Sequence, residues 1–309
     1  MPDLSYAVIG TGALGGLYGA MLARAGREVH FLLRSDYDHV RDHGLRIETV
    51  WGDFDLPDVN AHARPDDLPP VDVTLVATKT TLGDAVADLI RPPTSGGGVA
   101  LVLQNGLDVE RPITDAIGRD RTLSGCCFLC SNKVGPGHIR HLDEGRIVFG
   151  PLGQTDPSLV RRIADDFTAA GVPVKTSTDI AAVRWRKLLW NIPFNGLSVV
   201  LDAATDELIR DPAATALASD LIEEIATAAA AVGVTIPPEA KTKTIEATRA
   251  MVPYDSSMRV DYRHGRELEI AAIFDAPIAA AAAAGVAMPR TQTLRDQLRF
   301  LDARNRHTP

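Results

Sequence analysis

The sequence has few of the features that mark secreted, membrane-bound or nucleic-acid-binding proteins. It has three cysteines, too few for a disulfide framework, and this odd number fits a reducing compartment. Its net charge is −8, so it lacks the basic surface that binds nucleic acid. The N-terminus has no basic and apolar signal segment, and the alanine-rich stretch 276–287 is too short to span a bilayer. We therefore expect a cytoplasmic protein with neither a nucleic-acid nor a membrane partner.

The three cysteines, Cys126, Cys127 and Cys130, could in principle ligate a metal ion. They lie in or beside the apolar stretch 123–129, which predicts a buried strand, and no histidine follows at ligand spacing. Buried cysteine behaves as a small apolar residue. We therefore expect these side chains to pack in a core, and we predict no metal site.

The clearest motif is a glycine-rich turn near the N-terminus. Apolar residues 6–9 lead into GTGALG, after which residues 16–25 keep the apolar spacing of a helix. In such a turn Gly10 permits the bend, Gly12 lets the backbone approach a pyrophosphate, and Gly15 lets the helix pack on the strand. The alternative is a chance cluster of glycines. Because a strand precedes the motif and a helix follows it, we predict a dinucleotide site formed by Gly10, Thr11, Gly12, Ala13, Leu14 and Gly15.

The end of the next strand indicates which dinucleotide binds. Residues 28–33 predict that strand, and Arg34 follows it, where an enzyme that uses NAD usually has an acidic residue for the ribose 2′-hydroxyl. A basic residue there favours a 2′-phosphate, so we predict NADPH. In the alternative, Arg34 is solvated and Asp36 contacts the ribose.

Two further strands, 71–78 and 99–103, are almost continuously apolar, as in a parallel sheet buried on both faces. Lys79 follows the first, and Asn105 lies two residues beyond the second. Ligands bind outside the carboxyl ends of such strands, so we expect both side chains to face the cofactor cleft. Each could equally be an ordinary turn residue.

The pattern changes along the second half of the chain. A turn at 135–137 precedes residues 138–141 and 147–150, which predict an antiparallel hairpin. Beyond Asp179 the strand pattern ends, and long amphipathic segments predict helices over 180–201, 213–232, 238–249, 268–285 and 291–305. We therefore predict an α/β fold, with a Rossmann-type dinucleotide-binding domain over 1–176 and an all-helical domain over 177–309.

The first of these helices carries three polar residues among apolar ones. Lys187, Asn191 and Asn195 recur every four residues, which places them on one helix face. They could form a site, or they could cap and bridge helices. Pro193 should kink the helix or free a carbonyl group. Glu269 lies between Leu268 and Ile270, where a charge exposed at a helix start is the simpler interpretation.

Taken in order, these motifs resemble the ketopantoate reductase family (2-dehydropantoate 2-reductase). The matching stretches are GTGALG, TKT at Lys79, LQNGL at Asn105, WRKLLWN at Lys187, SSM and LEI. The resemblance covers essentially the whole chain and implies NADPH-dependent reduction of a 2-keto acid, most simply ketopantoate, in pantothenate and coenzyme A biosynthesis. It also implies a cleft between the two domains. The sequence departs from the family at Ile192, Pro193, Phe194 and Gly196, where familiar members have small residues and an asparagine–proline pair. This difference bears on the identity of the substrate more than on the type of reaction.

The resemblance also implies roles for individual residues. Lys187 matches the family's catalytic lysine. Glu269 matches the substrate-binding glutamate, and we expect it to act in catalysis together with Lys187. The positions that match substrate-binding residues are Asn191, Asn195, Ser257 and Asn105, and those that match the cofactor cleft are Arg34, Lys79 and Asn105. A homodimer is one assembly that the sequence leaves open.

The chemistry of hydride transfer supports the same roles. Reduction of a 2-keto acid builds negative charge on the carbonyl oxygen, and a lysine can both meet this charge and deliver a proton. Two other functions stay open: a related dehydrogenase for another 2-keto or 3-hydroxy acid, and a regulatory protein that senses NADPH. A sensor would not require Lys187, Asn191 and Glu269 together.

Overall fold

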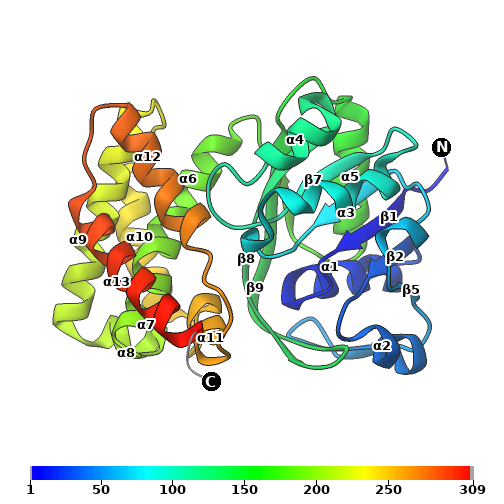
Figure 1. Cartoon of the computed structure of the whole chain (residues 1–309), viewed down its shortest axis with the longest axis horizontal. Coiled ribbons are helices and arrows are strands. Elements are labelled where there is room, and N and C mark those ends of the chain that lie inside the picture. The colour runs from blue at the N-terminus through cyan, green and yellow to red at the C-terminus, as the bar shows by residue number, and fades with distance from the viewer. Residues whose placement is uncertain (1, 307–309) are drawn as a thin grey trace. The chain divides into compact units, whose positions relative to one another are not determined.

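The computed structural model describes residues 2–306, which divide into two compact units (Figure 1). The first contains the residues up to Gln104 together with Val109–Ile180, and the second contains Asn105–Asp108 together with the residues from Ala181 onward. The short segment Asn105–Asp108 joins the second unit because the Leu107 amide donates to the Ala272 carbonyl (2.9 Å) and Arg184 donates to the Gly106 carbonyl (3.0 Å). The domain boundary predicted after residue 176 coincides with the end of the last strand of the first unit.

A mixed sheet forms the centre of the first unit, with the order β4-β3-β9-β8-β7-β6-β1-β2-β5 and with β10 also paired to β9. From β5 to β8 all neighbouring strands are parallel. The strands are β1 (Ser5–Ile9), β2 (Glu28–Leu32), β3 (Leu45–Thr49), β4 (Phe54–Leu56), β5 (Asn60–His62), β6 (Val73–Val76), β7 (Val99–Val102), β8 (Thr122–Gly135), β9 (His138–Pro151) and β10 (Val174–Thr176).

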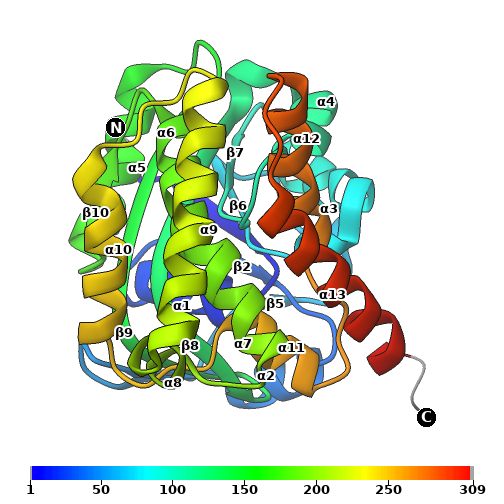
Figure 2. The same cartoon turned by 90° about the vertical axis from the view of Figure 1, so that its left-hand side faces the viewer.

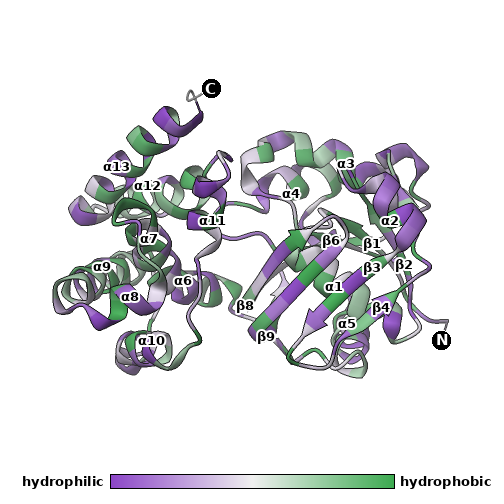
Figure 3. Ribbon diagram, turned by 90° about the horizontal axis from the view of Figure 1, so that it is seen from below, coloured by the Kyte–Doolittle hydropathy of each residue, from purple (hydrophilic) through white to green (hydrophobic). Residues whose placement is uncertain are grey.

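Helices cover both faces of the parallel part of this sheet. They are α1 (Ala13–Arg24), α2 (Tyr37–His43), α3 (Val86–Thr94), α4 (Arg111–Ile117) and α5 (Pro157–Ala169). The chain steps from β1 to β2 in one direction and from β6 to β7 in the other, so right-handed crossovers place α1 and α3 on opposite faces. Helix α5 packs beside α1, and α4 packs beside α3 (Figure 3). Strands β6 and β7, which are almost continuously apolar, are buried as predicted.

The predicted hairpin between 138–141 and 147–150 is wrong, because these residues belong to one strand, β9. Strand β9 pairs antiparallel with β8 through the turn at 136–137, and Figure 3 shows the two long strands together. Glu144 (φ 62°) and Gly145 (φ 108°), between the two predicted strands, form a bulge where the pairing shifts between Phe128 and Leu129. A bulge bends a strand without reversing it, and short-range patterns do not distinguish the two outcomes.

The second unit contains only helices among its described residues, as predicted. They are α6 (Ile180–Trp190), α7 (Gly196–Val200), α8 (Thr205–Arg210), α9 (Pro212–Ala231), α10 (Pro238–Ala250), α11 (Ser257–Arg263), α12 (Ala276–Ala283) and α13 (Pro289–Arg306). Helix α9 lies between α10 and α13 (Figure 2), and its small buried residues, such as Ala218 and Ala228, allow close packing. No helix within residues 2–306 is long and apolar enough to cross a membrane.

Two π-helical segments interrupt this unit, Asn191–Asn195 between α6 and α7 and Ala271–Asp275 before α12. The sequence predicted a helix over 180–201 that Pro193 kinks or in which it frees a carbonyl group, and the first π segment lies at that proline. It predicted an uninterrupted helix over 268–285, and this is wrong. Pro193 has no amide hydrogen to donate to the carbonyl four residues earlier, so regular α-helical bonding cannot continue through it. The wider π turn accommodates the proline within a continuous helical path.

Candidate active site

The three glycines of the turn differ in the space that surrounds each of them. Gly10 has φ 100°, and a Cβ there would lie 2.6 Å from the Thr78 backbone nitrogen. A Cβ at Gly15 would lie 2.4 Å from the Gly10 carbonyl oxygen, so only glycine lets α1 approach β1 this closely. A Cβ at Gly12, in contrast, would meet nothing within 4 Å. The position next to the start of α1 is therefore open, as a pyrophosphate would require.

The start of α1 is suited to an anion. Gly12 precedes the helix and provides no side-chain cap, and the first turn, which begins with Ala13 and Leu14, contains no acidic residue. The Thr11 hydroxyl donates to the Leu32 carbonyl (2.9 Å) and so fixes the glycine turn to the end of β2. Amide hydrogens at this helix end remain available for phosphate oxygens.

The two charged candidates after β2 have different surroundings. Arg34 is exposed and makes no hydrogen bond or ion pair within residues 2–306. Asp36 is buried, and its carboxylate accepts the Gly137 amide (2.9 Å) and the Ser35 hydroxyl (3.0 Å) and pairs with Lys133. Burial raises the pKa of Asp36, but Lys133, the Gly137 amide and Ser35 together outweigh it and hold this pKa below its usual value. Asp36 is therefore bound to protein groups, which weakens its alternative role as the ribose partner.

Lys79 and Asn105 follow the ends of β6 and β7. Lys79 is exposed and directly precedes a 3₁₀ turn, Thr80–Ala85. The Gln104 amide donates to the carbonyl (3.1 Å) and to the hydroxyl (3.0 Å) of Thr78, which joins the two strand ends. Asn105 is half-buried and begins the short segment that belongs to the second unit.

The polar residues of the second unit include two deeply buried asparagines in the first π turn. Asn191 is 3% exposed and Asn195 is 1% exposed, while Lys187 on α6 is half-buried. Asn191 Nδ2 and Asn195 Oδ1 have no hydrogen-bond partner among residues 2–306. A buried polar atom without a partner costs about 1–3 kcal/mol, and π turns often occur at functional sites. Asparagines that only bridged helices would use these atoms, so the geometry favours a ligand-binding role.

The loop before α11 contains a buried hydroxyl pair that the sequence interpretation missed. Ser256 caps α11 by accepting the Arg259 amide (3.2 Å), and its hydroxyl lies 2.7 Å from that of Ser198. Ser198 in turn donates to the Asn195 carbonyl (2.9 Å). The candidate Ser257 is the first residue of α11 and is half-buried. The N-cap preference of serine before a helix could have identified Ser256, but no local signal identifies Ser198.

An ion-pair cluster holds the same loop. The buried guanidinium of Arg259 donates to Asp202 Oδ1 (3.0 Å) and carbonyl oxygen (2.7 Å), and it also pairs with Asp255. Hydrogen bonding from Arg259 lowers the pKa of Asp202. Asp202 itself has φ 46°, in the turn after α7. The cluster ties the turn after α7 to the loop that precedes Ser257.

Glu269 is 5% exposed, so the interpretation as a surface charge at a helix start is wrong. Only Ile270 separates it from the second π segment, and its neighbours Leu268 and Ile270 are also buried. A carboxylate is kept in such a place only with charged or hydrogen-bonding partners.

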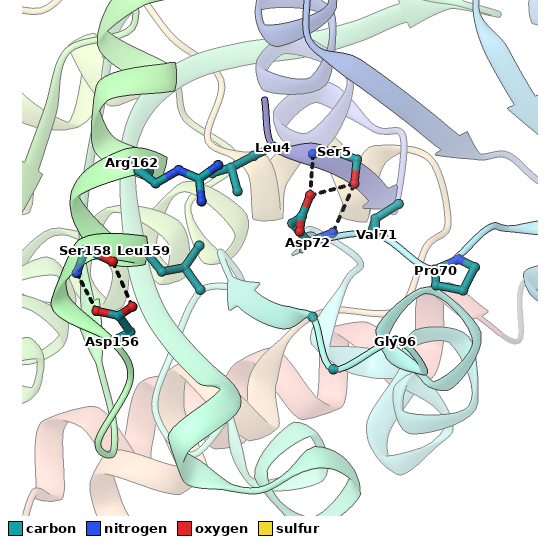
Figure 4. A pocket seen from close by; sticks show the side chains of 12 residues that line it. Leu4, Ser5, Pro70, Val71, Asp72, Gly96, Asp156, Ser158, Leu159 and Arg162 are labelled. Atoms are coloured by element: carbon teal, nitrogen blue, oxygen red, sulfur yellow. Dashed lines mark hydrogen bonds between the residues drawn. The ribbon is translucent and has the colours of Figure 1, made fainter. Parts of the chain in front are cut away.

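Two other features lie apart from these residues. The three cysteines are buried in β8, as predicted. A surface pocket of about 460 Å³ lies at the opposite, amino ends of β1, β6 and β7 (Figure 4). Its polar groups bond to one another, since Asp72 accepts the Ser5 hydroxyl (2.9 Å) and Asp156 accepts the Ser158 hydroxyl (2.7 Å). Arg162, which also lines the pocket, donates to the Pro2 carbonyl (2.6 Å), so these polar side chains already bond to protein groups.

The fold and the open glycine turn define the class: a Rossmann-type dinucleotide-binding protein with an all-helical second unit. Residues 6–154 match the family described as ketopantoate reductase PanE/ApbA, and residues 179–302 match the C-terminal region of that family. A 2-dehydropantoate 2-reductase from Nostoc sp. is 44% identical over 99% of this chain and 98% of its own. The chain belongs to the ketopantoate reductase family, which confirms the resemblance.

Solved structures agree with this assignment. The structure of 2-dehydropantoate 2-reductase from Geobacter metallireducens has a TM-score of 0.93 and 39% identity, and the match covers 96% of this chain and 99% of that one. D-mandelate dehydrogenase with NADH and anilino(oxo)acetate has a TM-score of 0.90 over 98% of this chain and 99% of its own. At 22% identity, that second likeness shows the fold alone.

Proposed function

We propose that this protein reduces 2-dehydropantoate (ketopantoate) to pantoate with NADPH, a step of pantothenate and coenzyme A biosynthesis. The 44% identical relative of that name, matched over nearly the whole of both chains, supports the substrate. The observation that carries the proposal is a pair of buried amide atoms that have no hydrogen-bond partner among residues 2–306. They are Asn191 Nδ2 and Asn195 Oδ1, on the helical path that continues from Lys187. The Asn191 Nδ2 group can donate to a keto or carboxylate oxygen, and Asn195 Oδ1 can accept from a hydroxyl group of the substrate.

The proposed roles follow from the charge that develops during the reaction. The dinucleotide, when bound, supplies the hydride that adds to C2 of the keto acid. The carbonyl oxygen then becomes an alkoxide, and the Lys187 ammonium meets this charge and donates the proton that completes the hydroxyl group. Asn191, Asn195 and Ser257 hold the substrate, and the buried Glu269 shares the catalytic role with Lys187.

The cofactor residues are proposed on the same basis. Gly10, Gly12 and Gly15 shape the pyrophosphate site, with Thr11, Ala13 and Leu14 between them. Lys79 and Asn105 serve the cofactor cleft, and Arg34 binds the 2′-phosphate. NADPH should bind at least about tenfold more tightly than NADH, because a charge-assisted contact contributes about 1.5–3 kcal/mol. Titration of the parent protein and of Arg34→Ala with both cofactors tests this, and equal affinities in the parent would remove Arg34 from the site.

A related dehydrogenase for another 2-keto acid is the second candidate. The segment after Lys187 favours it, since the large residues Trp190 and Phe194 stack there with ring centroids 5.6 Å apart. A chain of similar fold, D-mandelate dehydrogenase, was solved with anilino(oxo)acetate. A regulatory NADPH sensor has less support, because it needs none of the buried amides.

NADPH oxidation, followed by absorbance against a panel of 2-keto acids, separates these candidates. The highest kcat/KM for ketopantoate supports the proposal, and a higher value for an aromatic 2-keto acid supports the second candidate. Binding without turnover of any acid would favour the sensor. A dimeric ketopantoate reductase is known from Staphylococcus aureus, and a homodimer remains a prediction for this chain.

A further inference from the structure

Opposite charges lie two residues apart at the place where a Rossmann-type protein recognises the adenosine ribose. Arg34 and Asp36 both follow β2, which ends at Leu32. A positive charge there favours a 2′-phosphate, and a negative charge repels the phosphate and favours a free 2′-hydroxyl. The cofactor preference therefore depends on which of the two charges acts on the ribose.

The structure neutralises the acidic member of this pair from a distant part of the chain. Lys133 lies near the end of β8, and its ammonium pairs with Asp36 Oδ2, which also accepts the Gly137 amide from the following turn (2.9 Å). The Asp36 side chain is 8% exposed and that of Lys133 is 33% exposed. The Ser35 hydroxyl donates to the other carboxylate oxygen (3.0 Å). Both oxygens of Asp36 thus accept protein donors.

Arg34, in contrast, has no carboxylate partner within residues 2–306 and is exposed. A free Asp36 carboxylate two residues away would be its nearest acidic neighbour in sequence, and it would compete with a phosphate for the guanidinium. The pairing with Lys133 removes that competition.

We propose that Lys133 is a specificity-determining residue for the cofactor, because by neutralising Asp36 it leaves the positive charge of Arg34 to a 2′-phosphate. Lys133 acts through Asp36 and is a positioning residue in this scheme. The inference rests on the proposed use of NADPH, but it concerns the ratio of affinities for NADPH and NADH rather than activity.

The expected size of the effect follows from the charges. A phosphate monoester carries about −1.5 to −2 charges at pH 7. An uncompensated carboxylate two residues along the chain from Arg34, in surroundings of intermediate dielectric constant, should weaken its binding by roughly tenfold or more. NADH lacks this phosphate and should be affected far less.

The experiment measures dissociation constants for NADPH and NADH by fluorescence titration of the purified full-length protein. Lys133→Met should lower the ratio of NADPH to NADH affinity by roughly tenfold or more, and Lys133→Arg should keep it within about threefold of the parent. The double variant Lys133→Met/Asp36→Asn should restore the ratio, because it removes the released charge. Lys175→Met, which replaces an exposed lysine on β10 of the same sheet, is the matched control.

Each outcome decides the proposal. An unchanged ratio in a folded Lys133→Met protein overturns it, and so does a ratio that stays low in the double variant, because Lys133 would then act on the phosphate directly. If Lys133→Met does not fold, Asp36→Asn decides: a retained or increased preference for NADPH supports the proposal, and a shift toward NADH overturns it. The parent protein could prefer NADH while Lys133→Met still lowers the ratio of NADPH to NADH affinity. This result would refute the proposed cofactor but would support the role of Lys133.

Discussion

Replacement of Gly12 by valine should separate dinucleotide binding from folding. Gly12 has φ −97° and ψ −157°, an extended conformation that any residue adopts, and a Cβ there meets nothing within 4 Å. The folded state therefore has room for valine. Valine is a poorer residue than glycine at the start of a helix, so the substitution should lower the free energy of unfolding by about 1 kcal/mol. This corresponds to a decrease of about 2–4 °C in Tm for a protein of this size.

The effect on binding should be much larger. The valine side chain would occupy the open space through which a pyrophosphate reaches the helix amides. Each hydrogen bond to a charged acceptor contributes about 1.5–3 kcal/mol, so loss of two of them costs about 3–6 kcal/mol. This corresponds to roughly 10²- to 10⁴-fold weaker binding. Titration with NADPH and NADH measures the affinity, and thermal unfolding followed by circular dichroism measures the stability.

Gly15→Ala is the control that should behave in the opposite way. Its Cβ would lie 2.4 Å from the Gly10 carbonyl oxygen and 2.9 Å from the Ala77 Cβ, so helix α1 would have to move away from β1. Overpacking of this kind typically costs about 1–3 kcal/mol or more. The reasoning is refuted if Gly12→Val binds either cofactor within threefold of the parent, or if it unfolds at as low a temperature as Gly15→Ala.

Three further predictions concern single side chains. Lys187→Ala should lower kcat by roughly 10²- to 10³-fold with little change in NADPH affinity, whereas the exposed Arg186→Ala should matter far less; turnover of Lys187→Ala within a few-fold of the parent would return this lysine to a structural role. Ser198→Ala should lower the free energy of unfolding by about 1–3 kcal/mol and raise KM more than it lowers kcat, measured by urea unfolding and steady-state kinetics; an unchanged KM would mean that the hydroxyl pair only supports the fold. Because the pKa of Asp36 is lowered in the folded protein, its contribution is present above the unfolded pKa near 4 and is lost as the pH falls through the folded pKa. The stability difference between the parent and Asp36→Asn, measured by urea unfolding, should therefore be largest near neutral pH and should shrink in acid, and a difference independent of pH would contradict the pairing.

Features specified by neighbouring residues could be predicted from the sequence. The glycine turn is one, because Gly10 and Gly15 are required by contacts with residues close in the chain or at the end of the adjacent strand. Strands β6 and β7 are another, since burial on both faces demands a continuous apolar run. The change to an all-helical second unit is visible in the period of the apolar residues alone.

Features that depend on partners far along the chain could not be predicted. The bulge at Glu144 in β9 arises from pairing with β8, and β9 also pairs with β3 and β10 at its two ends. The neutralisation of Asp36 requires Lys133, 97 positions later. Burial of Glu269 likewise depends on the packing of the helical unit, because its flanking residues alone fit an exposed helix start as well as a buried one.

The two π segments show that the sequence can identify the polar residues of a site even where regular helical spacing gives their positions wrongly. The segments Asn191–Asn195 and Ala271–Asp275 pack against each other, one containing the buried asparagines and the other following shortly after Glu269. A proline lies in the first, and Pro277 lies just after the second, so both interruptions occur where a backbone donor is missing. A π turn bonds each residue to the one five positions along, so it adds a residue to the turn and changes the direction of the side chains that follow. The four-residue spacing from Lys187 therefore identifies the two asparagines, whereas Pro193 accounts for the altered turn in which they lie.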